Sequence, residues 1–173
     1  MSIAFTMTPG RGDTDLLLRA VADGLIASGR RPAGLVQINT ERADAGPCDM
    51  DVRVLPAGPV IRISQSLGRA SRGCRLDPGA LEDAVGHVAA GLEAGADCLI
   101  VNKFGKHEAE GRGFRPVIAE AIARGLPVIV GLNALNAPAF HDFTEGAAVE
   151  LDATVPAITG WLTGHLPLPV AVA

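Results

Sequence analysis

Apolar and polar residues follow two kinds of pattern along the chain, short apolar runs and longer stretches with helical spacing. The apolar runs predict β-strands, and stretches in which apolar residues recur every three or four positions predict helices. Leu16, Leu17, Val21 and Leu25, for example, are predicted to form the apolar side of a helix over 13–28. Strands that alternate with helices are typical of an α/β protein, whose mainly parallel sheet lies between layers of helices.

The predicted elements cover most of the chain. Strands are expected at 2–7, 33–38, 98–101, 127–132 and 147–151, and helices at 13–28, 77–93, 114–124, 138–144 and 154–165. The segment 39–78 differs, because Gly, Pro, Arg and Asp are frequent in it and only 52–55 and 60–63 resemble strands. We therefore predict a single domain over 1–173, in which 39–78 is a small hairpin and loop insertion.

Composition narrows the class of partner. The chain has 173 residues, 48% of them hydrophobic, which is enough for a substantial core. A formal net charge of −4 and 3% aromatic residues argue against nucleic acid as a partner. No basic, apolar signal segment precedes the first strand, and no apolar run is long enough to span a bilayer. We expect a cytoplasmic protein without membrane insertion.

The three cysteines form no C-x-x-C pair, and their odd number fits a reducing compartment. Cys98 belongs to an apolar run and is expected in the core. Cys48 and Cys74 are weak candidates for soft-metal ligands, and Cys74 with Arg72 and Arg75 offers a cradle for an oxyanion such as molybdate, phosphate or sulfate. The alternative is two separate small cysteines in a loop.

The segment 7–14 has the frame of a phosphate-binding loop without its charge. On the pattern G-x-x-x-x-G-K-[ST], Gly12 and Thr14 are in register, whereas Met7 replaces the first glycine and Asp13 replaces the lysine. That lysine normally reaches the outer phosphates, and a carboxylate in its place repels them. The frame predicts a nucleotide-binding fold, and the charge argues against ordinary hydrolysis.

Two interpretations of this loop stay open. In the first, backbone N–H groups at the start of the following helix bind an anion, and Arg11 supplies the positive charge. In the second, Asp13 neutralises the same helix terminus, and the loop is a self-capped turn without a ligand. On the first interpretation the ligand-binding residues are Pro9, Gly10, Arg11, Gly12, Asp13 and Thr14.

A second candidate site follows the apolar run 98–101. In a parallel sheet, ligands bind at the carboxyl ends of strands, and the segment 102–115 leaves such an end with basic side chains interleaved with glycines. The alternative is a solvated loop whose acidic residues neutralise the basic ones. The candidates here are Asn102, Lys103, Gly105, Lys106, His107, Arg112 and Arg115, with Gln37 and Asn133 expected at the same crevice from two other strands.

The segments "DCLIVNKFGKHEAEGRGFRPVIAEAIARGLPVIVGLN", "SRGCRLDPGAL" and "GLVQ" resemble an uncharacterised bacterial family, domain of unknown function 2478, often labelled a molybdenum-transport ATP-binding protein. More distantly, "TPGRGDT" and "LIVNKFGKHE" are similar to the two motifs of P-loop nucleoside triphosphatases, which implies a three-layer fold of that class. The second motif places Asn102 on the magnesium-associated aspartate, Lys103 on the neighbouring glutamate, and Glu108 on a later glutamate; Gly105 matches. These departures argue against a standard magnesium-dependent hydrolase.

Two functions follow as hypotheses. The first is an accessory protein that binds a small anionic ligand, a nucleotide or an oxyanion such as molybdate or phosphate, linked to molybdenum by the family label alone. The second is a nucleoside triphosphatase or phosphotransferase with a rearranged site, in which Lys103 or Lys106 replaces the missing lysine and Glu108 acts as a base. An exposed surface carboxylate is the expected state of Glu108. A transporter partner stays open, and the apolar tail 166–173 leaves a homo-oligomer open.

Overall fold

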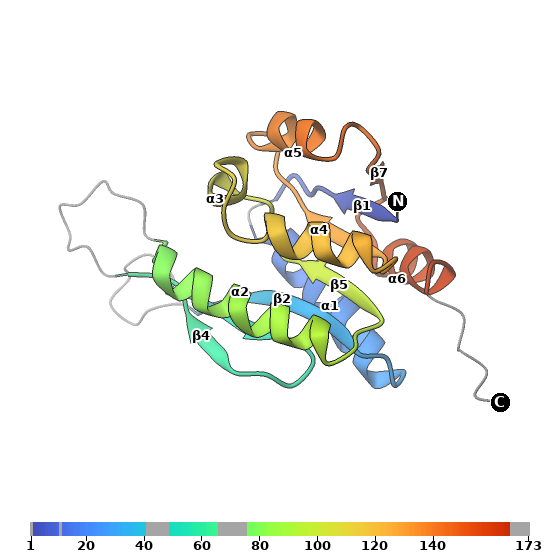
Figure 1. Cartoon of the computed structure of the whole chain (residues 1–173), viewed down its shortest axis with the longest axis horizontal. Coiled ribbons are helices and arrows are strands. Elements are labelled where there is room, and N and C mark those ends of the chain that lie inside the picture. Colours follow the sequence, from blue (N-terminus) through green and yellow to red (C-terminus); the bar gives the residue numbers. More distant parts are fainter. Residues whose placement is uncertain (1, 11, 41–48, 66–75, 167–173) are drawn as a thin grey trace.

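A computed structural model of the chain describes residues 2–10, 12–40, 49–65 and 76–166, and Figure 1 shows their arrangement. Within these residues the strands are β1 (Ile3–Thr6), β2 (Pro32–Thr40), β3 (Asp49–Val54), β4 (Val60–Arg62), β5 (Cys98–Val101), β6 (Val128–Gly131) and β7 (Val149–Glu150). The helices of the same residues are α1 (Asp13–Ala27), α2 (Pro78–Glu93), α3 (Lys106–Ala109), α4 (Arg115–Ala123), α5 (Ala137–Phe143) and α6 (Val155–Gly164).

The described strands form one sheet in the order β4-β3-β2-β5-β6-β1-β7. The five strands from β2 to β7 in that order run parallel, and β3 and β4 extend the sheet beyond β2 as an antiparallel hairpin. The short central strands β1, β5 and β6 are completely buried, as expected for parallel strands with helices on both faces. The predicted α/β class, mainly parallel sheet and hairpin insertion are confirmed.

Two apolar clusters occupy the two faces of this sheet. One contains side chains of α2 and α4, and the other contains side chains of α1 and α6. Figure 1 shows α2 and α4 side by side over one face, with α1 behind the sheet. The molecule therefore has the predicted three layers. In the described residues no helix is both long and apolar enough to cross a membrane.

The predicted apolar side of α1 is correct in part. Val21 and Leu25 are buried and Leu17 packs partly buried against the same cluster, but Leu16 is 67% exposed. The buried residues are Asp15, Leu18, Val21, Ala22 and Leu25, which have the three- and four-residue spacing of one helical face. The first place of this buried face is a carboxylate, which an analysis of apolar positions alone did not find.

Two differences from the expected elements lie near the carboxyl ends of strands. β2 continues to Thr40, two residues beyond the expected end, because it pairs with β3 as far as Thr40 and Asp49. The short helix α3 was not expected at all. It follows β5 and is stabilised by Glu108, whose side chain accepts a hydrogen bond from the backbone N–H of Gly105.

Candidate functional site

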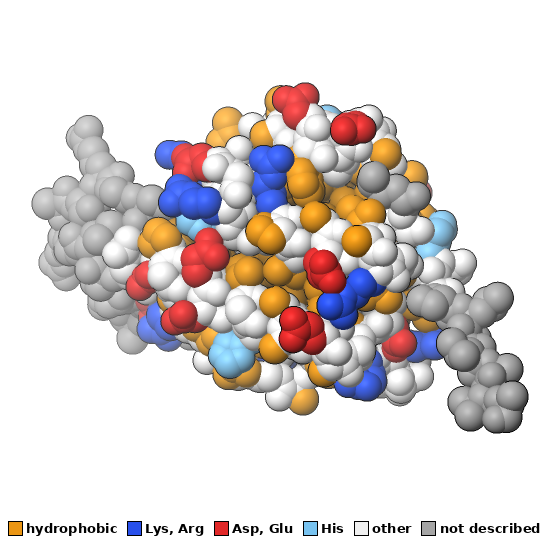
Figure 2. Space-filling model, in the orientation of Figure 1, with side chains coloured by type: hydrophobic (Ala, Val, Ile, Leu, Met, Phe, Trp, Pro, Cys, Tyr) orange, Lys and Arg blue, Asp and Glu red, His pale blue; other side chains and the backbone are white. Residues whose placement is uncertain are grey.

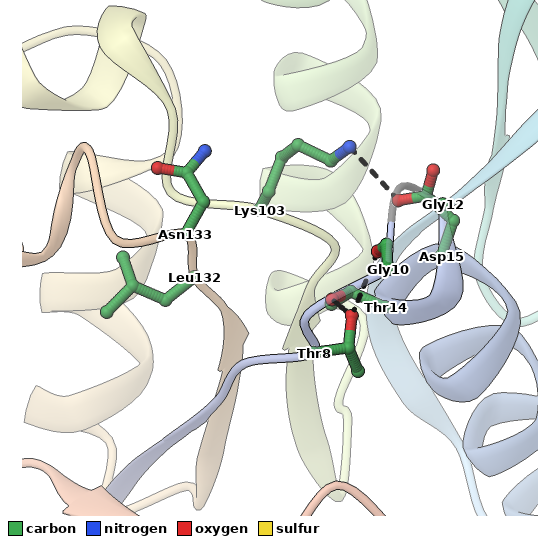
Figure 3. A pocket seen from close by; sticks show the side chains of 8 residues that line it. All are labelled: Thr8, Gly10, Gly12, Thr14, Asp15, Lys103, Leu132 and Asn133. Carbon is green, nitrogen blue, oxygen red and sulfur yellow. Dashed lines mark hydrogen bonds and ion pairs between the residues drawn. The ribbon is translucent and has the colours of Figure 1, made fainter.

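A hollow of about 200 Å³ opens at the carboxyl ends of three adjacent strands, β5, β6 and β1. Its walls come from the loop between β1 and α1 with the first turn of α1, from Lys103 after β5, and from the two residues after β6. Figure 3 shows Lys103 and Asn133 on one side of this hollow and the loop with α1 on the other. The lining residues are Thr8, Gly10, Gly12, Thr14, Asp15, Lys103, Leu132 and Asn133.

The loop before α1 is held by its own backbone and by two hydroxyl groups. Gly12 has a φ of 86°, a left-handed conformation that favours glycine, and its carbonyl accepts hydrogen bonds from the N–H groups of Asp15 and Leu16. The Oγ1 atoms of Thr8 and Thr14 are 2.7 Å apart and form a hydrogen bond across the loop. The phosphate-loop frame predicted from Gly12 and Thr14 thus has a defined shape in the structure.

Asp13 lies on the outside of the loop. Its carboxylate packs directly on Gly10, where an added Cβ would be only 1.9 Å from Oδ2 of Asp13. Asp13 is exposed, and within the described residues its carboxylate accepts no hydrogen bond from the start of α1. The self-capped turn therefore does not form through a hydrogen bond of this side chain.

Asp15 is the charged lining residue that the sequence analysis missed, together with the uncharged Thr8 and Leu132. The side chain of Asp15 is 5% exposed. Oδ1 accepts a hydrogen bond from Nδ2 of Asn102 at 2.7 Å and lies 3.1 Å from Nζ of Lys103. Oδ2 accepts a hydrogen bond from Nδ2 of Asn39 at 2.9 Å. Asp15 therefore joins the start of α1 to the ends of β2 and β5.

Asn102 links the same elements from the other side. Its Oδ1 accepts a hydrogen bond from the backbone N–H of Gln37 at 3.1 Å, while its Nδ2 donates to Asp15. The side chain of Gln37 donates to Oδ1 of Asn39 at 2.7 Å, so Gln37 contacts Asn102 through its backbone and Asn39 through its side chain. Asn102 is buried, and both ends of its amide have partners.

Among the described residues, Lys103 is the basic side chain that lines the hollow. Its side chain is 44% exposed and extends from the end of β5 toward the loop, where it meets Asp15 (Figure 3). An ammonium group has three donors. One faces Asp15, which leaves two that are able to face a ligand. Lys103 therefore brings positive charge into the hollow from β5, whereas the P-loop pattern places it within the loop.

The structure contradicts the expectation that Glu108 is an exposed carboxylate. Glu108 is 3% exposed. Its Oε2 accepts a hydrogen bond from the backbone N–H of Gly105 at 2.9 Å, and its Oε1 accepts one from Phe114 at 3.2 Å. Glu108 and Gly105 thus hold the backbone between β5 and α4, and neither lines the hollow at Lys103.

The other basic residues of 102–115 do not converge on this hollow. His107 and Arg112 line a separate, more open hollow of about 480 Å³ at the starts of α2 and α4. There Nε2 of His107 is 2.7 Å from Oε1 of Glu82. Lys106 is almost fully exposed and pairs with Glu110, as Arg112 does, and Arg115 lies 4.5 Å from the ring centre of Phe143. The predicted basic cluster is therefore dispersed, with Lys103 alone among its described cations at the first hollow.

Five predicted residues lie outside the described residues: Arg11, Cys48, Arg72, Cys74 and Arg75. Pro9 is exposed on the loop and Asn133 lines the hollow, at the end of β6 as expected. Among the described residues, no group of three His, Cys, Asp or Glu side chains is placed to hold a metal ion. Cys98 is completely buried, as predicted.

The fold and the position of the hollow define a class of protein. The chain is similar to the solution structure of a human cancer-related nucleoside triphosphatase, with a TM-score of 0.59, 18% identity and 87% of each chain covered. It therefore has the fold of the P-loop nucleoside triphosphatases. Residues 3–161 match the family described as a protein of unknown function, DUF2478. The chain belongs to this family.

A longer relative is also similar in sequence. Over 149 residues the chain is 36% identical to a protein of Bradyrhizobium diazoefficiens named molybdenum import ATP-binding protein ModC 2. The match covers 86% of this chain and 17% of that protein. The chain thus corresponds to a small part of the length of this relative.

Proposed function

We propose that this protein binds the phosphate group of a nucleotide, or a free oxyanion, in the hollow between the β1–α1 loop and Lys103. The observation that carries the proposal is the ammonium group of Lys103, 3.1 Å from Asp15 at the edge of a P-loop-like frame. It supplies the positive charge that the loop itself lacks, because Asp13 stands at the position of the motif lysine. The positive end of the α1 helix dipole adds a second source of attraction for an anion, although the N–H groups of Asp13, Asp15 and Leu16 already donate to backbone carbonyls.

The size of the hollow favours a small anionic group. About 200 Å³ is less than the roughly 300–1,000 Å³ of sites that enclose a drug-sized ligand. A tetrahedral oxyanion fits inside this volume, whereas the nucleoside of a nucleotide would lie outside the hollow. The site is therefore suited to recognising the terminal phosphate of a larger molecule or a free ion.

The side chains at the motif positions argue for binding without magnesium-dependent hydrolysis. The Thr14 hydroxyl is bonded to Thr8, and the Asn102 amide is bonded to Asp15 and to the backbone of Gln37. At the position of the metal-associated carboxylate, a metal ion would meet the amide of Asn102, which is a weaker partner for it than a carboxylate. Glu108 is buried, accepts hydrogen bonds from two backbone N–H groups and does not line the hollow, so it is not placed to activate water there.

The similarity to a protein named for molybdenum import supports an accessory role in molybdenum handling, in association with a transporter. The alternative is a nucleoside triphosphatase or phosphotransferase in which Lys103 replaces the motif lysine. The position of Lys103 favours it, but the enzyme would also need a carboxylate for the attacking group. Asp15 lines the hollow, but taking up a proton would remove the charge that pairs with Lys103. Binding without turnover is therefore the proposed function.

The test compares two lysine variants. Phosphate, molybdate and ATP, each with and without magnesium, are titrated into the wild type, Lys103→Ala and Lys106→Ala and followed by calorimetry and thermal unfolding. A ligand at 100 times its Kd stabilises the native state by about 2.7 kcal/mol. We expect Lys103→Ala to weaken binding at least tenfold. Lys106 is exposed and does not line the hollow, so Lys106→Ala is the matched control.

Equal losses in both lysine variants would contradict the site. Magnesium-dependent release of phosphate from ATP that disappears in Lys103→Ala would replace the binding protein by the enzyme. Both outcomes are measured on the same purified samples. The far-ultraviolet circular dichroism of each variant shows whether it is folded.

A further inference from the structure

One wall of the hollow is a carboxylate, which is unusual for a site that attracts anions. Resting on the function proposed above, we propose that Asp15 selects the ligand, and that the site takes an oxyanion that still carries a proton. Inorganic phosphate belongs to this chemical class at neutral pH, and phosphate monoesters, whose second pKa is about 6, join it as the pH falls. Sulfate and molybdate do not, because they are fully deprotonated at neutral pH.

The hydrogen bonds of Asp15 leave room for such a proton. An ionised carboxylate has about four acceptor positions and no donor. Asn102 and Lys103 occupy Oδ1, and Asn39 occupies one position on Oδ2. Among the described residues, no donor occupies the second acceptor position on Oδ2. A ligand oxygen that approaches it favourably must carry a hydrogen.

Charge repulsion makes this a strong requirement. Two like unit charges about 5 Å apart in a partly buried site repel each other enough to lower affinity by about a hundredfold. The side chain of Asp15 is only 5% exposed, so water screens this repulsion poorly. A protonated ligand oxygen replaces the repulsion by a hydrogen bond to Asp15, while Lys103 donates to an unprotonated oxygen of the same ligand.

A merely supporting role of Asp15 predicts a different result. If Asp15 only held Lys103 in position, its removal would weaken the binding of all oxyanions, and by less than tenfold, as for a partly exposed ion pair. If Asp15 selects a protonated ligand, its neutralisation strengthens the binding of unprotonated oxyanions in particular. The ratio of affinities therefore separates selection from positioning.

The experiment measures the affinities of the full chain for inorganic phosphate, sulfate and molybdate at pH 7 by calorimetry. We expect the wild type to bind phosphate at least tenfold more tightly than sulfate or molybdate. Asp15→Asn is expected to reduce this ratio below threefold, because sulfate and molybdate bind more tightly. Asp83→Asn is the matched control: Asp83 is exposed on α2 and does not line the hollow, so this change should leave the ratio as it is.

Equal binding of molybdate and phosphate by the wild type, abolished for both by Lys103→Ala, would refute the selection and leave the proposed function intact. Binding of none of the three ions, nor of ATP, would refute the proposed function itself. A ratio that survives in folded Asp15→Asn would also contradict the role of Asp15.

A second measurement on the wild type serves if Asp15→Asn does not fold. The second pKa of a phosphate monoester is about 6, whereas sulfate does not change its charge between pH 7 and pH 5. The affinity for methyl phosphate relative to sulfate should then rise about tenfold from pH 7 to pH 5. An unchanged relative affinity would overturn the proposal.

Discussion

Two buried carboxylates, Asp15 and Glu108, organise the region around the hollow in different ways. Each is about 3% exposed, and each accepts hydrogen bonds that satisfy its charge. Asp15 binds side chains, among them the partly exposed donor Lys103, and lines the hollow. Glu108 binds two backbone N–H groups and faces none of the lining residues. At the residue scale, the partner groups therefore separate a ligand-facing carboxylate from a structural one.

The structural role of Glu108 predicts a loss of stability without a loss of binding. Glu108→Ala leaves the N–H groups of Gly105 and Phe114 without their acceptor, which costs about 2–4 kcal/mol in the free energy of unfolding. Urea unfolding measures this difference. The control is Glu110→Ala, in which an exposed carboxylate is removed and little change in the free energy of unfolding is expected. A stable Glu108→Ala variant would show that the capping interaction is not needed.

At the scale of elements, the ends of the central strands are held close together by glycines. A Cβ on Gly131, the last residue of β6, would lie 2.1 Å from the carbonyl oxygen of Asn102 and 2.8 Å from Cγ2 of Thr14. The absence of a side chain therefore lets β6, the end of β5 and the start of α1 approach one another. This approach brings Lys103 and the β1–α1 loop to the same hollow.

Gly131→Ala is predicted to disturb stability and site together. The added methyl group meets backbone atoms that cannot move independently, so the free energy of unfolding should fall by about 1–3 kcal/mol. Affinity for phosphate should fall with it, since Asn102 and Lys103 would be displaced. Gly86→Ala is the matched control on the exposed surface of α2. Nothing lies within 4 Å of a Cβ added there, so the free energy of unfolding is expected to rise by about 0.5–1 kcal/mol. Denaturant unfolding and calorimetry report both quantities.

At the scale of the whole molecule, the sheet separates two apolar layers, and charge is confined to the surface and the strand ends. On the face shown in Figure 2, basic and acidic side chains are interspersed rather than gathered by sign. Cys98 lies inside the layer that contains α1 and α6. Burial, with a smaller contribution from Asp97, raises the pKa of the Cys98 thiol to about 12, compared with an ordinary value of 9.0.

This pKa shift predicts that the stability of the whole molecule falls in alkaline solution. Above about pH 9 the thiol ionises in the unfolded chain, while the native protein keeps its proton until about pH 12. The unfolded state then binds fewer protons than the native state, so the free energy of unfolding decreases with pH, by about 1.4 kcal/mol between pH 8 and pH 10. Urea unfolding at both pH values measures the decrease.

Cys98→Ala is the comparison for this measurement, because it removes the thiol and keeps the rest of the chain. The chain has no tyrosine, so few other groups titrate in this range. The variant is less stable at pH 8 owing to the lost packing, but its further decrease toward pH 10 should be smaller by about 1.4 kcal/mol. Equal decreases in both proteins would contradict the role of Cys98.

Most of the fold could be predicted from local patterns. The apolar runs at 98–101 and 128–131 are strands, and the cap Asp77 followed by Pro78 begins α2 as expected. These features depend on neighbouring residues, which the sequence displays directly. The order of the strands and the pairing that extends β2 to Thr40 depend on distant residues, and the sequence alone did not predict them.

The candidate site divides in the same way. The sequence by itself determined the frame of the loop, the replacement of its lysine by Asp13, and the place of Lys103 after a central strand. Only the tertiary structure decided which charged groups meet: it joined Lys103 to Asp15, enclosed Glu108, and separated Arg112 from both. The physical reason is the separation along the chain of the residues that interact. Helix and strand formation depends on residues a few positions apart, whereas the charge state of a site depends on side chains that folding brings together from 87 positions away.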